Sequence, residues 1–209
     1  MAAIPLQREV FYPESDGKPM AETDLHIDEL IYLRRALRHH FRDEPDVYVA
    51  GNLLFYYRQG DPSGVVSPDL FVVQGIPKKQ RRKYLLWEEG KAPCMVVEVT
   101  SRSTRREDLA KKKDLYEQLG VEEYFLFDIL GEYLSPRLQG YRLRNGRYQA
   151  LQPGPGGALV SETIGIILVP ETEALRLVDA ATGEILLRPE EMEAEVARLK
   201  EELARLRKE

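Results

Sequence analysis

A glutamate stands inside an apolar segment of the sequence, in the run CMVVEVT over residues 94–100. The run predicts a strand, in which Val96, Glu98 and Thr100 share one face because successive side chains point to opposite faces. A charged side chain is seldom buried unless it is paired or binds a metal ion, so Glu98 requires a partner. The alternative is that this face lies at a sheet end open to water.

A second carboxylate follows a proline in the run SPDLFVV, where Asp69 precedes an apolar segment that predicts another strand. An aspartate in this place has two interpretations. Pro-Asp is ordinary turn chemistry, so Asp69 can be a strand-entry residue. If the two strands are neighbours, however, Asp69 and Glu98 can form a pair of carboxylates.

A lysine follows on the helix predicted from about residue 104 to 119. Thr104 and Glu107 match the capping-box pattern that marks a helix start. At about 100° per residue, Lys112 falls near the centre of an apolar stripe formed by Leu109, Leu115, Tyr116 and Leu119.

The neighbours Lys111 and Lys113 then point toward solvent, and Lys112 needs an anion. Asp108 is one candidate, through an i, i+4 pair. Glu98, or a ligand beside it, is the other.

Two carboxylates and an inward lysine are a specific chemical set. Mg²⁺ (or Mn²⁺) is bound in proteins by one or two carboxylates together with water and substrate phosphate. A nearby ammonium can stabilise charge that develops on phosphorus or orient the attacking water. The set therefore predicts hydrolysis of a phosphodiester.

The elements that position these residues can be read from hydrophobic periodicity. A first amphipathic helix, capped by Thr23 or Asp24, ends before Pro45. The runs 47–57 and 65–73 predict a hairpin, and strand 94–100, the helix and strand 123–128 predict a right-handed crossover with a parallel pair. Asn145-Gly146 predicts a further hairpin. More strand is predicted at 164–169, 175–178 and 185–187, so the fold class is α/β with α+β character and a mixed sheet.

The C-terminal segment 189–209 predicts a separate helix. It opens with Pro189 and glutamates, and its apolar residues recur at spacings of 4, 3, 4 and 3. Those residues are Met192, Val196, Leu199, Leu203 and Leu206. We therefore divide the chain into a domain at 1–188 and a coiled-coil-like helix at 189–209 that either forms a homodimer or packs on the domain.

The whole chain has 209 residues and a net charge of -5, so a nucleic-acid partner would have to be met by a local basic patch. Its single cysteine, Cys94, lies in an apolar run and allows no internal disulfide, which is typical of a reducing cytosol. No stretch approaches the roughly 20 apolar residues of a membrane span. The sequence predicts a cytoplasmic protein without a membrane partner.

Several of these segments together resemble the Uma-two family of restriction endonucleases, within the PD-(D/E)XK nuclease superfamily. The resemblance covers about residues 20 to 180 and is carried by Pro68-Asp69, the run 98–106, Asp108, Lys112, Tyr116, the Leu-Gly-Val run ending at Val121, and the run 123–128. It implies a restriction endonuclease-like fold, with a mixed sheet flanked by helices and here followed by a β extension.

The resemblance also implies roles for individual residues. Asp69 and Glu98 match the acids that bind Mg²⁺, whereas Thr100 stands where the superfamily's lysine is expected. The Uma-type pattern is similar in placing a lysine on the following helix, which matches Lys112. Glu22 matches an acidic residue of the first helix, and His26 is expected to line the site; alternatively, Glu22 is a helix-start glutamate favoured by the dipole.

A DNA partner also requires cations near the site. Two clusters are candidates for contacts with nucleic acid: Lys78, Lys79, Arg81, Arg82 and Lys83 in the run KKQRRK, and Arg102, Arg105 and Arg106 around the start of the Lys112 helix. The first cluster can equally be a solvated loop.

The sequence thus predicts a Mg²⁺-dependent DNA endonuclease. Two alternatives remain open. One is a non-catalytic dimeric scaffold or regulator that retains the nuclease fold. The other is a metal-dependent hydrolase of a smaller phosphoester.

Overall fold

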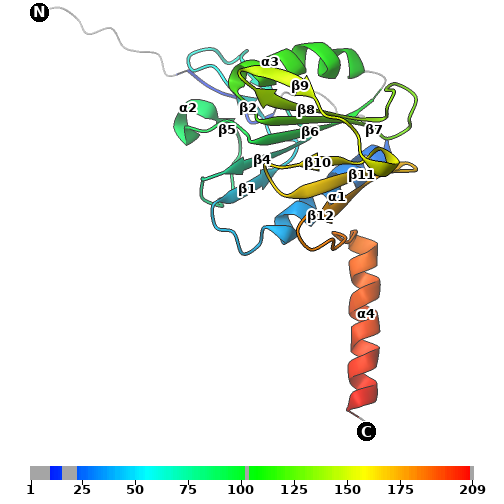
Figure 1. Cartoon of the computed structure of the whole chain (residues 1–209). Helices are drawn as coiled ribbons and strands as arrows, with labels where there is room; N and C mark the ends of the chain where they lie inside the picture. The colour runs from blue at the N-terminus through cyan, green and yellow to red at the C-terminus, as the bar shows by residue number, and fades with distance from the viewer. Residues whose placement is uncertain (1–9, 16–22, 102–103, 208–209) are drawn as a thin grey trace, which may run out of the picture.

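The computed structural model describes residues 10–15, 23–101 and 104–207. A six-stranded mixed sheet forms its centre, with strand order β1-β4-β6-β7-β8-β9 (Figure 1). The strands are β1 (Val47–Ala50), β4 (Leu70–Gln74), β6 (Met95–Thr100), β7 (Glu123–Asp128), β8 (Leu138–Arg144) and β9 (Arg147–Ala150). Within this sheet, as the structure describes it, β6 and β7 are the one parallel pair, as the strand–helix–strand pattern predicts. The mixed sheet and the α/β class are confirmed.

Helix α1 (Asp24–His40) covers one face of this sheet. The Thr23 side chain caps it by accepting a hydrogen bond from the His26 backbone N–H. Its buried residues Tyr32, Leu33 and Leu37 pack into a hydrophobic cluster with inward-facing residues of β1, β4 and β6. The predicted first helix is therefore confirmed.

A three-stranded sheet of β10 (Leu159–Ser161), β11 (Ile166–Glu171) and β12 (Ala174–Asp179) packs against the same cluster. A short 3₁₀ turn, η2 (Pro155–Gly157), precedes it. The predicted strands near 164–169 and 175–178 are present, but 185–187 forms only one bridge, between Ile185 and Val178. The β extension, which consists of β10, β11 and β12, thus adds residues to the hydrophobic cluster that α1 covers.

The predicted long strand 47–57 is interrupted. Its first part, β1, joins the main sheet, whereas β2 (Phe55–Tyr56) lies in a small sheet with β3 (Val65–Val66) and β5 (Tyr84–Leu85), which is followed by the short helix α2 (Leu86–Glu89). The break falls at Asn52, whose φ of 51° is incompatible with a continuous strand. The single hairpin prediction was therefore wrong in this detail, and the Asn145-Gly146 turn between β8 and β9 was right.

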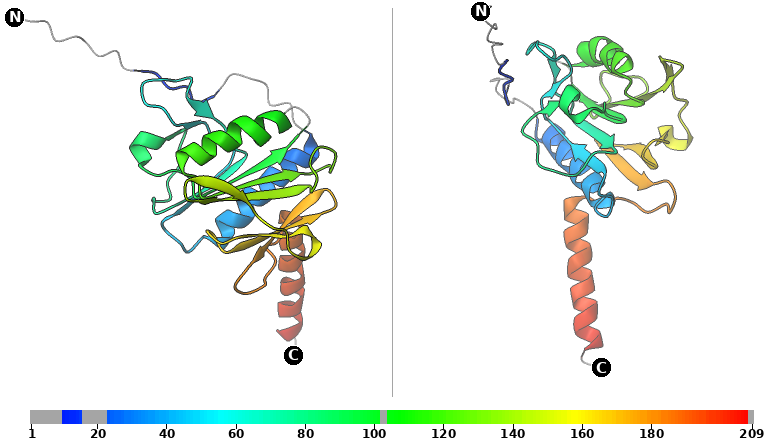
Figure 2. Two further views of the ribbon diagram at one scale, coloured as in Figure 1. Left: turned by 45° about the horizontal axis from the view of Figure 1, so that its top comes forward. Right: turned by 90° about the vertical axis from the view of Figure 1, so that its left-hand side faces the viewer.

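The opposite face of the main sheet carries the helix that follows β6. It has two parts, a π-helical segment η1 (Glu107–Lys112) and the α-helix α3 (Lys113–Leu119), which ends at Gly120 in the left-handed conformation. Tyr116 packs there with residues such as Val96 and Tyr124. Figure 2 shows α1 and α3 on opposite sides of the sheet.

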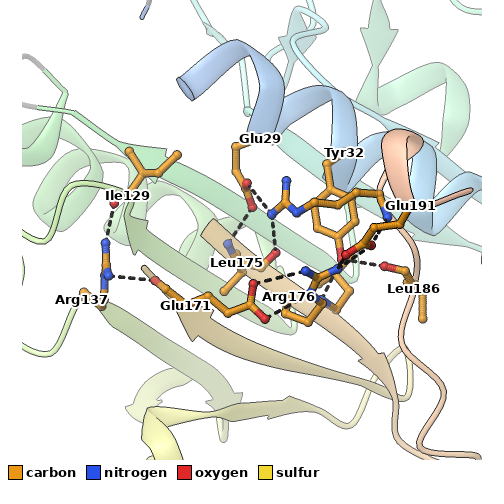
Figure 3. A network of polar contacts seen from close by, with 11 residues as sticks. Glu29, Tyr32, Ile129, Arg137, Glu171, Leu175, Arg176, Leu186 and Glu191 are labelled. Carbon is orange, nitrogen blue, oxygen red and sulfur yellow. Dashed lines mark hydrogen bonds and ion pairs between the residues drawn. The ribbon is translucent and has the colours of Figure 1, made fainter. Parts of the chain in front are cut away.

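Helix α4 (Pro189–Leu206) extends away from the rest of the molecule (Figure 1). Its first turn is tied to the domain by ion pairs from Arg188 to Glu29 at 2.9 Å and from Arg176 to Glu191 at 2.7 Å. The Tyr32 hydroxyl adds a bond to the Leu186 carbonyl (Figure 3). The five apolar residues of its heptad pattern are all exposed. Among the described helices, none is both long and apolar enough to cross a membrane.

Candidate active site

Antiparallel pairing of β4 and β6 brings the two predicted carboxylates together. Leu70 pairs with Val97, so the preceding residue, Asp69, lies beside Glu98. The Asp69 backbone N–H donates to Glu98 Oε2 at 3.3 Å, and the Val99 N–H donates to Asp69 Oδ2 at 2.8 Å. The sheet register, which neither local sequence determines alone, therefore builds the carboxylate pair.

Glu98 is fully buried, with 0% of its surface exposed. Two groups from the helix across the sheet face satisfy it. The Tyr116 hydroxyl donates to Oε1 at 2.8 Å, and Lys112 Nζ lies 2.9 Å from Oε2. The alternative of a carboxylate at a sheet end open to water is therefore wrong.

Lys112 joins both anions that the sequence offered. Its Nζ lies 2.9 Å from Glu98 Oε2 and 2.9 Å from Oδ1 of Asp108, which is also buried. Lys111 is exposed, as predicted, but Lys113 extends over the Tyr141 ring at 3.8 Å. The inward position of Lys112 is confirmed.

The predicted helical phase was right for Lys112 and wrong nearby. Leu109, expected on the inward stripe, is exposed, and Asp108 faces inward instead. The reason is the π-helical geometry of Glu107–Lys112, whose wider i→i+5 turns shift the phase before the α-helix resumes. The expected capping box is also replaced, since the Thr104 hydroxyl accepts from the Ser101 N–H at 3.1 Å.

Burial and charge together set the protonation of this cluster. Burial raises the pKa of Glu98 to about 8, with Lys112 opposing the rise and Asp69 and Asp108 adding to it. Burial lowers the pKa of Lys112, but Glu98 and Asp108 outweigh it and hold that pKa above its usual range. Lys112 is therefore a permanent ammonium near neutral pH, surrounded by three carboxyl groups.

Asp69 is the more accessible of the paired carboxylates, with 18% of its side chain exposed. His26 approaches it from the first turn of α1, with Nε2 at 3.8 Å from Asp69 Oδ2, and its site-lining role stays a prediction. Thr100 is buried, and among the described residues its hydroxyl has no hydrogen-bond partner. An additional polar ligand beside Glu98 would remove the cost of that buried hydroxyl.

These side chains fit a hard divalent cation. Asp69 and Glu98 offer carboxylate oxygens from adjacent strands, the type of donor that Mg²⁺ and Mn²⁺ select. Within the part of the chain that the structure describes, no group of three or more His, Cys, Asp and Glu side chains forms a ready-made metal cluster. The pair would thus depend on water and substrate phosphate for its remaining ligands.

The basic run 78–83 lies away from this site. It follows the C-terminal end of β4, whereas Asp69 precedes its N-terminal end, and five strand residues span about 17 Å. Its cations also have internal contacts: Lys78 with the Phe41 carbonyl, Lys79 and Arg81 with Glu89, Arg82 with Glu14, and Lys83 with the Tyr12 carbonyl. DNA binding by this run stays a prediction, and the structure favours a structural role.

The second basic cluster is closer to the site in sequence. Arg105 lies near the Tyr133 ring, at 5.8 Å, and Arg106 is exposed beside the start of η1. Glu22 and Arg102 lie outside the described residues, so their predicted roles stay predictions.

One residue that contacts Glu98 was not predicted from the sequence. Tyr116 was assigned to an apolar stripe, yet its hydroxyl binds Glu98. The available signal was its position four residues after Lys112, which puts both side chains on one helix face.

Comparisons with known proteins agree with this architecture. A search of curated proteins found no match. Among solved structures, the chain is similar to a protein from Anabaena variabilis described as "a putative nuclease belonging to DUF820", with 16% sequence identity and a TM-score of 0.51. The likeness covers 70% of this chain and 76% of that one. It confirms the nuclease-like fold.

The sequence profile of the family Uma2, described as "Putative restriction endonuclease", matches residues 3–168. These residues include both strands and the helix that carry Asp69, Glu98 and Lys112. This chain therefore belongs to the Uma2 family.

Proposed function

We propose that the protein is a Mg²⁺- or Mn²⁺-dependent endonuclease that hydrolyses phosphodiester bonds of DNA. One observation carries the proposal: a buried ammonium lies 2.9 Å from a carboxylate that antiparallel pairing sets beside a second, accessible carboxylate. The family's description supports a nuclease. The single, buried cysteine agrees with action in the reducing cytoplasm.

The chain's own residues divide the work. Asp69 and Glu98 would hold the cation, and Asp69 is oriented for this by the Val99 N–H. A bound divalent cation polarises the phosphoryl oxygen and lowers the pKa of a bound water. His26 borders the accessible side of Asp69 and can contact incoming water or phosphate.

Lys112 acts as a cation in this proposal. Because its pKa is raised, it donates hydrogen bonds and cannot accept a proton from water near neutral pH. It holds Glu98 in position and offsets the negative charge of three carboxylates and the entering phosphate. In this proposal Lys112, on the following helix, takes the role that the family resemblance expects of a strand lysine at the position of Thr100.

A titration tests the metal site. We expect Mn²⁺ to bind the wild type in isothermal titration calorimetry and to bind Glu98→Gln at least about a hundredfold more weakly, since a carboxylate ligand is lost. Binding requires Glu98 to release the proton that its raised pKa retains, so affinity should increase from about pH 6.5 to 8.5.

Glu107→Gln is the matched control, because Glu107 is exposed on the neighbouring helix. Unchanged Mn²⁺ affinity in Glu98→Gln would contradict the assignment of the metal site.

The partner expected for α4 is a second copy of the chain. The heptad pattern has Met192, Leu199 and Leu206 at d positions and Val196 and Leu203 at a positions. Valine at an a position with leucine at d positions favours a parallel dimer. In a parallel pair, Glu195 would face Lys200 of the second copy and Glu202 would face Arg207. An antiparallel pair would instead bring the glutamates at the g positions together, so charge favours the parallel arrangement.

Changing the apolar seam tests this assembly. We expect the wild type to have twice the 24.0 kDa chain mass in light scattering and the double variant Leu199→Glu, Leu203→Glu to be monomeric. Ala197→Glu with Ala204→Glu adds the same charges off the seam and should remain dimeric. A monomeric wild type would contradict the proposed dimer and the dimeric scaffold alternative. It would not contradict the proposed nuclease activity.

A further inference from the structure

Two arginines of α1, Arg34 and Arg38, lie one helical turn apart beside the strand edge that leads to Asp69. Arg34 Cδ comes within 3.4 Å of the position that a Cβ on Gly51 would occupy, and the Asp69 carbonyl oxygen lies 2.8 Å from the same position. Gly51 thus permits the close approach of helix and strand. Arg34 therefore lies over the backbone that carries Asp69.

Arg38 continues this surface into a cavity of about 440 Å³. The cavity lies between α1, β1 and the segment 78–80, and β1 is an edge strand of the main sheet. Three further cations, Arg42, Lys78 and Lys79, line it, and the Tyr48 ring forms part of its wall. The cavity is therefore basic and open along a sheet edge.

Not all of these cations are available to a ligand. Arg42 pairs with Asp43 at 3.2 Å, and Lys79 pairs with Glu89 at 3.3 Å. Lys78 donates to the Phe41 and Arg42 carbonyls and so neutralises the negative C-terminal end of α1. Arg34 and Arg38 are therefore the cations of this surface that remain for a ligand.

Arg34 and Arg38 are exposed, and they differ in their contacts from the partly buried arginines of the molecule. Arg142, Arg176 and Arg188 all lie within 3 Å of a glutamate oxygen. Among the described residues, no carboxylate forms an ion pair with Arg34 or Arg38. Burial and the neighbouring Arg38 instead lower the pKa of Arg34. An anion bound between these two guanidinium groups would offset the cost of burying the Arg34 charge and the repulsion between the two arginines.

The direction of this surface suits an extended polyanion. His26, in the first turn of α1, lies next to the Asp69 carboxylate. Arg34 and Arg38 follow along the helix at i, i+4 spacing, about 6 Å apart, and Arg42 lies just beyond the helix end at His40. Strand β1 runs alongside, from the cavity at Val47 to Ala50 near Asp69. Positive charge therefore leads from the candidate site to the cavity.

We propose that Arg34, Arg38 and the cavity beyond them bind the phosphodiester backbone of the DNA strand that passes through the Asp69 site. This inference rests on the proposed function and assigns its substrate-binding surface. The surface is distinct from Arg105 and Arg106, and it uses the run 78–83 only where Lys78 and Lys79 line the cavity.

Fluorescence anisotropy with a short fluorescein-labelled DNA duplex tests the inference, with Ca²⁺ replacing Mg²⁺ so that the DNA stays intact. We expect Arg34→Ala with Arg38→Ala to weaken binding about tenfold and to lower the slope of log affinity against log salt by about 0.9 for each lost contact. Arg35→Ala is the matched control. It removes one charge from α1, about 100° around the helix from Arg34, so it is matched to the single variant Arg34→Ala, which should lose more affinity and salt slope than Arg35→Ala.

Hydrolysis of bis(p-nitrophenyl) phosphate with Mn²⁺ separates this inference from the proposed function. This small diester reaches Asp69 without the basic surface, so the double variant should hydrolyse it like the wild type. Equal affinity and equal salt slope in Arg34→Ala and Arg35→Ala would overturn the proposed basic surface, even if the diester is cleaved. No metal-dependent cleavage of the diester or of DNA by the wild type would instead reject the proposed function.

Discussion

Glu98→Gln is expected to reduce Mn²⁺-dependent nicking of supercoiled plasmid by about a thousandfold and to raise the thermal stability of the metal-free protein. The two effects have one cause. A buried carboxylate beside Asp69 and Asp108 is unfavourable in the empty fold, and the same carboxylate is needed to bind a cation. Glutamine can still accept the Tyr116 hydrogen bond and leaves Lys112 paired with Asp108.

The stability gain should depend on pH in a defined direction. The folded protein keeps the Glu98 proton up to about pH 8, whereas the unfolded chain releases it near the ordinary pKa of 4.5. Wild-type stability attributable to this group is therefore present below pH 4.5 and is lost as pH rises toward 8. Thermal unfolding followed by circular dichroism in EDTA should show a larger advantage for Glu98→Gln at pH 8.5 than at pH 6.

Because Glu107 is exposed, Glu107→Gln should alter neither the nicking activity nor the thermal stability. A Glu98→Gln protein that is less stable than wild type at pH 8.5 would mean that the glutamate is a structural ion-pair partner rather than part of a metal site.

Lys112→Met is expected to lower the free energy of unfolding by about 3–5 kcal/mol at pH 8 and to abolish nicking. Methionine fills a similar volume but leaves Glu98 and Asp108 buried near each other without a cation. Loss of the ammonium also raises the pKa of Glu98 further, because Lys112 is what lowers it. Urea denaturation at pH 6 and pH 8 would measure the loss, which should be smaller at pH 6.

Lys111→Met provides the control on the same helix. Lys111 is exposed, so its replacement should change stability by less than about 0.5 kcal/mol and leave nicking intact. If Lys112→Met behaved like Lys111→Met, the buried ammonium would have neither the structural nor the catalytic role described.

The main elements of this site could be predicted from sequence because strand and helix periods are strong local signals. The two-residue period put Glu98 on one strand face with Thr100, and the helical period selected Lys112 from three adjacent lysines. The register that sets Asp69 beside Glu98 was only an assumption, since strand pairing is a long-range property.

Other features could not be read locally. The π-helical segment η1 has no clear sequence signal, so Leu109 was placed inward and the buried position of Asp108 was missed. The cations of the run 78–83 resemble a DNA-binding loop in sequence, but their contacts with Glu14 and with the Tyr12 and Phe41 carbonyls come from distant segments. The basic surface on α1 was missed because Arg34 and Arg38 resemble the exposed charges of any amphipathic helix.

The proposed nuclease activity is tested by incubating supercoiled plasmid and Mn²⁺ with purified wild type and, in parallel, with purified Asp69→Asn. Asparagine retains an acceptor for the Val99 N–H, so the fold should persist while the accessible carboxylate is lost. The wild type is expected to relax the plasmid only when Mn²⁺ or Mg²⁺ is present, and Asp69→Asn is expected not to relax it. Equal nicking by both proteins, or none by the wild type, would contradict the proposed activity.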